Sequence, residues 1–106
     1  MAAVTLEELI SEAKVVAARN ASGNLQAVAI GWDASIGELR MDFYLAREIS
    51  DEDQDLCEQA SGEMSAACPD IRRAELAYIR SWRSQSEIEQ LPGLVYLGPL
   101  AKPTRP

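Results

Sequence analysis

The sequence predicts an α+β fold, a two-layer sandwich in which two helices cover an antiparallel sheet of about four strands. Three observations support this class. Two segments show apolar residues at helical spacing, two adjacent segments alternate with a period of two, and the element order is α-β-β-α-β-β. With 106 residues the chain has the length of one domain, which we expect to span 1–106 and to end in a frayed tail over 99–106.

The first predicted element is a helix over 6–19. Thr5 and Glu8 form a T-x-x-E capping box, in which each side chain can bond to the other residue's backbone N–H. Apolar residues then recur from Leu6 to Ala17 at intervals of three and four, so they share one helix face. The helix is expected to end at Asn20–Gly23, because Asn and Gly tolerate the left-handed cap conformation.

Two strands are predicted next, over 25–32 and 39–46, because both segments alternate with a period of two. From Val28 to Trp32 every second residue is large and the residues between are Ala or Gly, which is typical of a strand that is covered on both sides. The segment DASIG at 33–37 supplies turn residues. The two strands are therefore predicted to form a β-hairpin.

A second helix is predicted to begin after Ser50, an N-cap residue, and to end before Pro69. The acids at 51–53 occupy the first turn, where the helix dipole stabilises negative charge. Cys57 and Cys68 belong to the apolar face of this helix and would lie about 16 Å apart, too far for a disulfide. We expect two free thiols, as is usual in a reducing compartment.

The C-terminal third is less regular. Residues 73–82 fit a strand or a helix, and the preceding CPDI segment favours a strand. A single helical turn is predicted over 86–91 and a last strand over 93–98. The N-terminus has no basic region followed by an apolar run, and no segment is apolar enough to cross a bilayer, so we expect a cytoplasmic protein.

Most catalytic and cofactor chemistry is missing from the composition. The chain has no histidine, which excludes the usual Ser-His-Asp and Cys-His arrangements and His-ligated zinc, and it has no glycine-rich phosphate motif. Asp51, Asp53 and Asp55 match the first ligands of a calcium loop, but Leu56 and Gly62 stand where glycine and a bidentate Glu are required. We expect no enzymatic activity, no metal and no cofactor.

Charge is the strongest functional signal. The net charge of −7 disfavours nucleic acid as a partner, and we expect no membrane binding. From Glu48 to Ile71 there are eight acidic side chains and no basic one. Helix capping accounts for the acids at 51–53, and a solvated helix face is one interpretation of the rest. The other is a docking surface for a cationic protein, which the lack of interspersed basic residues favours.

A family resemblance agrees with the second interpretation. The capped helix TLEELISEAK, the hairpin LQAVAIGWDASIGELRMDFYL, the acidic second helix and the final LPGLVYLG strand together resemble small bacterial toxin-immunity proteins. These proteins occur in contact-dependent growth inhibition and in colicin-type systems. The resemblance implies binding to a cognate toxin domain, often a basic nuclease, by covering its active site or another essential surface.

The predicted partner-binding residues are four acids of the second helix that would give salt-dependent docking and three aromatic anchors. They are Asp51, Asp55, Glu58 and Glu63, with Trp32, Tyr44 and Trp82. Asp55, Glu58 and Glu63 are the acids for which we expect no basic neighbour. An alternative function is a structural or regulatory subunit that forms a homo-oligomer through a sheet edge, and a third is a small-ligand domain or an unconventional enzyme.

Overall fold

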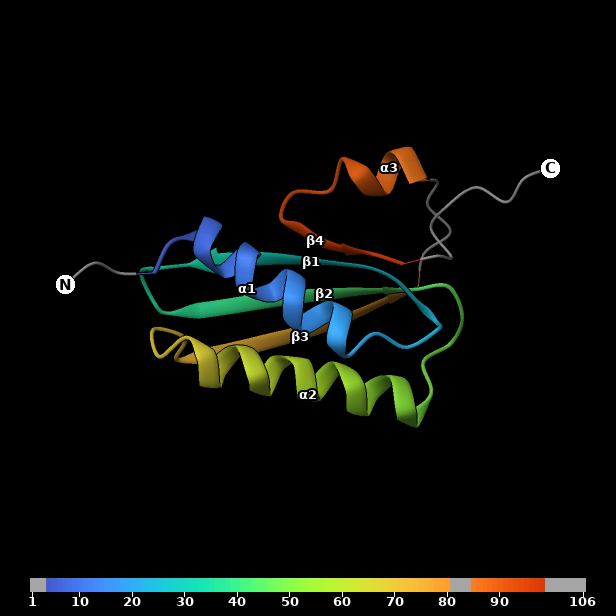
Figure 1. Cartoon of the computed structure of the whole chain (residues 1–106), viewed down its shortest axis with the longest axis horizontal. Coiled ribbons are helices and arrows are strands. Elements are labelled where there is room, and N and C mark those ends of the chain that lie inside the picture. Colours follow the sequence, from blue (N-terminus) through green and yellow to red (C-terminus); the bar gives the residue numbers. More distant parts are fainter. Residues whose placement is uncertain (1–3, 81–84, 99–106) are drawn as a thin grey trace.

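The computed structural model describes residues 4–80 and 85–98 (Figure 1). In chain order the elements are α1 (Leu6–Arg19), β1 (Leu25–Asp33), β2 (Glu38–Leu45), α2 (Asp51–Ala67), β3 (Arg73–Arg80), α3 (Gln85–Glu89) and β4 (Leu94–Leu97). The predicted α+β class and element order are confirmed, and the single helical turn predicted over 86–91 is α3. The end of the strand predicted over 73–82 and the tail at 99–106 lie outside the described residues.

The four strands form one sheet in the order β3-β2-β1-β4. β1 is antiparallel to β2 and to β4, but β2 and β3 are parallel, so the prediction of a purely antiparallel sheet was wrong. The cause is α2, whose 17 residues span about 25 Å, the length of the eight-residue strand β2. The helix carries the chain back to the end of the sheet where β2 began, and β3 therefore runs in the same direction.

The main core lies between the sheet and the two long helices. Figure 1 shows α1 in front of β1 and β2, with α2 alongside β3. The inward-facing residues of the hairpin pack against the apolar faces of both helices. The largest fully buried side chains of this core are Leu9, Val16, Val28, Leu39, Met41, Phe43 and Met64. The buried residues of α2 are Asp53, Cys57, Ala60 and Met64, so this face includes one carboxylate.

The opposite face of the sheet is covered only in part. Ile88 of α3 is fully buried there against Ala27, Ala29 and Tyr44. The rest of this face, which we call the charged sheet face, carries Glu38, Arg40, Asp42, Arg73 and Glu75. Ion pairs join its residues, at 3.0 Å between Arg40 and Asp42 and at 2.8 Å between Arg73 and Glu75. Its charges therefore largely compensate one another.

β4 lies very close to β1 at Gly93. The backbone N–H of Ile30 donates to the Gly93 carbonyl oxygen at 2.9 Å, and Gly93 has a φ of +71°. A side chain here would put its Cβ on the Ile30 carbonyl oxygen. Glycine is therefore required at this position by both backbone conformation and space.

We expect Gly93→Ala to destabilise the protein by about 1 to 3 kcal/mol or more, through the strained φ and the clash with Ile30. Gly62→Ala is the control with the opposite sign. Gly62 lies inside α2 with open space around it, so alanine should stabilise the fold by about 0.5 to 1 kcal/mol. Urea unfolding of both variants measures the effects, and a Gly93→Ala protein as stable as the wild type would contradict this account.

Candidate partner-binding site

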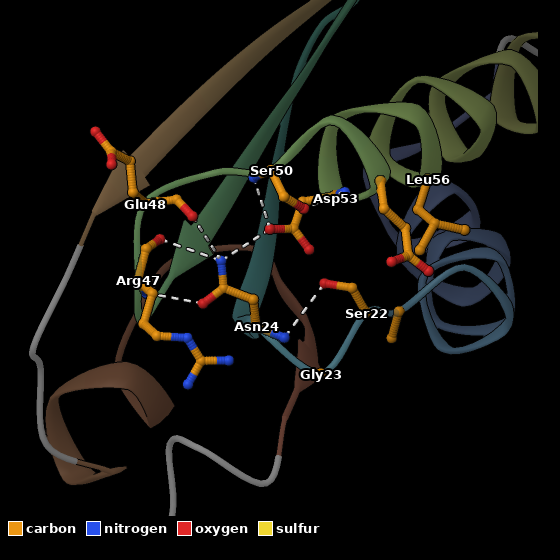
Figure 2. A pocket seen from close by; sticks show the side chains of 10 residues that line it. Ser22, Gly23, Asn24, Arg47, Glu48, Ser50, Asp53 and Leu56 are labelled. Carbon is orange, nitrogen blue, oxygen red and sulfur yellow. Dashed lines mark hydrogen bonds between the residues drawn. The ribbon is translucent and has the colours of Figure 1, made fainter.

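A hollow of about 460 Å³ opens between the α1–β1 connection and the beginning of α2 (Figure 2). Its walls are the α1–β1 connection, the β2–α2 connection and the first turns of α2. The lining residues are Ala21, Ser22, Gly23, Asn24, Arg47, Glu48, Ser50, Glu52, Asp53 and Leu56. Most of these side chains are polar, so the hollow suits a polar or charged group of a partner more than an apolar ligand.

Asn24 joins the walls of this hollow. Its side chain is buried, and its Nδ2 donates to the Arg47 carbonyl oxygen at 3.1 Å and to Oδ2 of Asp53 at 2.9 Å. Its Oδ1 accepts from the backbone N–H of Arg47 at 2.7 Å. One amide therefore fixes the β2–α2 connection and the first turn of α2 against the α1–β1 connection, as the dashed lines in Figure 2 show.

Asp53 is buried and structural. It forms a capping box with Ser50, accepting from the Ser50 backbone N–H at 3.0 Å while its own N–H donates to Ser50 Oγ at 3.1 Å. Burial alone would raise the pKa of Asp53, but hydrogen bonds from Ser22, Asn24 and Ser50 outweigh it and lower the pKa from 3.8 to about 2. The carboxylate is thus ionised and its hydrogen bonds are used within the fold.

Glu63 is also used within the fold, and the expectation that it has no basic neighbour was wrong. Arg19 of α1 donates to Glu63 Oε1 at 2.7 Å, and Asn20 Nδ2 donates to the same oxygen at 3.1 Å. The hydrogen bond from Arg19 is the largest of the effects that lower the pKa of Glu63. Arg19 belongs to another helix and precedes Glu63 by 44 residues. A search for basic residues within α2 therefore does not find it.

Four acids of α2 are exposed. Glu52 lines the hollow, and the other three, Asp51, Asp55 and Glu58, form what we call the acidic ridge. All three are exposed and follow one another at intervals of four and three residues, so they lie on one side of the helix over about 10 Å. Glu58 accepts from Gln54 Nε2 at 3.2 Å. Within residues 4–80 and 85–98, no cation forms an ion pair with any member of the ridge.

The predicted aromatic anchors do not lie with the ridge. Tyr44 is 7% exposed and lies on the opposite face of the sheet, against Ile88 of α3. Trp32 is half-buried against the main core and pairs with Leu39, near the end of the sheet away from the hollow. Trp82 lies outside the described residues.

Cys57 is not activated as a nucleophile. It lies on the buried face of α2, and burial, followed by the negative charges of Asp53 and Glu58, raises the pKa of its thiol to about 12. The thiol is therefore protonated at neutral pH and unreactive. In the part of the chain that the structure describes, no group of three or more Cys, Asp or Glu side chains is arranged to hold a metal ion. No helix in this part combines the length and the apolar character needed to span a membrane.

The sequence interpretation missed Asn24 and Arg47, which shape the hollow. Asn24 stands just before the buried strand β1, at a place where a polar residue needs internal hydrogen bonds, and this was the one available signal. Arg47 has no such signal in the sequence, because Asn24, whose side chain bonds to its backbone, lies 23 residues earlier in the chain.

The chain matches a known protein family. The family model described as MafI2 immunity protein matches residues 7–98, which include every described helix and strand in whole or in nearly its whole length. A search of curated proteins found no match.

We expect Asp53→Asn to lower the free energy of unfolding at pH 7 by about 1 to 2 kcal/mol, because charge-assisted hydrogen bonds to the carboxylate are lost. The folded-state pKa lies below the unfolded value of 3.8. The stabilisation by Asp53 is therefore complete above about pH 4 and is lost as the pH falls through about 2.

Urea unfolding between about pH 7 and pH 2 measures this difference, which should shrink toward the acid end. Glu52→Gln is the matched control, since Glu52 is an exposed acid in the same helical turn and should show a smaller effect. An Asp53→Asn protein with wild-type stability at pH 7 would mean that the buried carboxylate is not structural.

Proposed function

The chain belongs to the MafI2 immunity protein family and is a small toxin-immunity protein, and on this premise we propose that its acidic ridge and the adjoining hollow bind a basic toxin domain. The observation that carries the proposal is the division among the acids of α2. Asp53 and Glu63 are bonded within the fold, whereas Asp51, Asp55 and Glu58 face solvent and pair with no cation in the described chain.

Electrostatics makes a basic partner the natural complement of this surface. α2 carries six acidic side chains and no basic one, within a chain of net charge −7. A like-signed surface attracts a partner of opposite charge before contact and raises the association rate, most strongly at low salt. It also repels partners that lack the matching charge, which supports selectivity for a cognate toxin.

We propose a nuclease domain as the toxin class and occlusion as the mode of inhibition. A nuclease cleft is basic because its substrate is a polyanion, so an acidic ridge about 10 Å long can lie where the phosphates would lie. The immunity protein would then act without catalysis, in keeping with the absence of histidine and the protonated Cys57 thiol. The two free thiols support action in the cytoplasm.

The alternative of a homo-oligomer formed through the β3 edge of the sheet has less support. β3 is an edge strand of the sheet, and Arg73 and Glu75 on it are exposed and charged. Charged side chains on an edge strand oppose the addition of another strand. Sedimentation at micromolar concentration tests this alternative, and a stable dimer would require the ridge proposal to be reconsidered.

The first test is co-expression with the cognate toxin domain. We expect the two proteins to co-purify as a stoichiometric complex and the toxin's activity to fall to background at equimolar immunity protein. For a nuclease, the readout is cleavage of a labelled nucleic acid. A complex that leaves cleavage intact would refute occlusion of the active site while leaving toxin binding in place.

The second test neutralises the ridge. We expect Asp55→Asn with Glu58→Gln to lower the association rate constant about 3- to 10-fold at low salt and to weaken its salt dependence, because long-range attraction is reduced. Surface plasmon resonance at several salt concentrations measures both quantities. The substitutions keep side-chain size, so folding should be unaffected.

The matched control changes the same net charge on the charged sheet face, with Glu38→Gln and Glu75→Gln. Both residues pair with Arg73 and lie on the side of the sheet away from α2. This variant should associate with nearly the wild-type rate constant. Equal losses in the two variants would mean that net charge, and not the ridge, governs association.

A further inference from the structure

Arg47 is an isolated cation in the most acidic part of the chain. Between residues 41 and 71 it is the single basic residue, among nine acids. It lines the hollow at the beginning of α2, and no other basic residue does so. A surface that serves only to attract a basic partner would be more effective without it.

The backbone of Arg47 is held firmly in place. The buried side chain of Asn24 bonds to both of its polar main-chain groups, accepting from the N–H at 2.7 Å and donating to the carbonyl oxygen at 3.1 Å. The preceding N–H, of Ala46, donates to the Asn24 carbonyl oxygen at 3.1 Å. The guanidinium therefore extends from a fixed point on the wall of the hollow.

The guanidinium itself has no partner in the described chain. It is exposed and forms no hydrogen bond or ion pair there, although Glu48 is the next residue and Glu52 lines the same hollow. Figure 2 shows it pointing away from the carboxylate of Glu48. By contrast, Arg19 and Arg40 each pair with a carboxylate of the fold.

We infer that Arg47 binds a carboxylate of the toxin domain, from an Asp or Glu side chain that enters the hollow. The inference rests on the proposed function and adds a contact of opposite polarity to it. A planar guanidinium can bind a carboxylate through two hydrogen bonds. A basic toxin that lacks an acid at this point would place its own cations against Arg47, and this repulsion distinguishes the cognate toxin from related ones.

A specific contact between Arg47 and a toxin carboxylate and simple charge attraction predict opposite effects when the charge of Arg47 is removed. Arg47→Gln makes the surface more negative, so general attraction to a basic toxin predicts faster association and unchanged or tighter binding. Loss of a specific Arg–carboxylate contact predicts faster dissociation, because a charged group of the toxin is left without its partner. General attraction changes the association rate constant, whereas the specific contact changes the dissociation rate constant.

We expect Arg47→Gln, in the full chain, to raise the dissociation rate constant of the toxin complex about tenfold or more, while the association rate constant stays equal or rises. Arg47→Lys should recover part of the loss, since it restores charge without the planar fork. Because the guanidinium has no partner in the described fold, the free energy of unfolding should stay at the wild-type value. An unchanged or slower dissociation would overturn the inference.

Substitution of each acidic residue of the toxin domain by its amide locates the carboxylate. One of these toxin variants should show the same faster dissociation, with no additional effect when it is combined with Arg47→Gln. Purely additive effects for every toxin acid would also overturn the inference. If the Asp55 and Glu58 variant associates slowly but the Arg47→Gln complex dissociates at the wild-type rate, the inference fails and the ridge proposal stands. If neither variant differs from the wild type, the ridge is not the docking surface.

Discussion

The buried hydrogen bond between the Asn24 amide and the Asp53 carboxylate, 2.9 Å long, is the interaction on which the candidate binding surface depends. A buried charge and a buried amide are costly unless their hydrogen bonds are satisfied, and this contact satisfies part of the need of both groups. The same amide fixes the β2–α2 connection through Arg47. The direction in which α2 leaves the sheet, and therefore the side on which its exposed acids lie, follows from this contact.

The acids of α2 have separate physical roles although they look alike in the sequence. Asp53 caps the helix from inside the protein, and Glu63 ties the middle of α2 to the end of α1 through Arg19. Both are stabilised by partners. The ridge acids form no ion pair in the described part of the chain, and like charges one turn apart cost a few tenths of a kcal/mol each. The capping box and the buried face of α2 stabilise the helix by more than this repulsion costs. The ridge acids can therefore stay unpaired within the fold and bind a partner.

Much of the fold was predictable because its signals are local. Thr5 with Glu8 and Ser50 with Asp53 cap their helices through residues three apart, and alternation over a few residues defines the hairpin. The parallel pairing of β3 was not predictable in this way. It depends on the length of α2 relative to β2, and on the side of the sheet along which the helix returns.

The sequence by itself determined the class of fold, the excess of acid on one helix and the exclusion of histidine chemistry, because composition and short-range spacing carry this information. Only the tertiary structure decided which acids are free. Arg19 reaches Glu63 across 44 residues of chain, Asn24 reaches Asp53 across 29, and α3 covers Tyr44. A side chain's availability to a partner is set by contacts between distant segments, and no local pattern contains them.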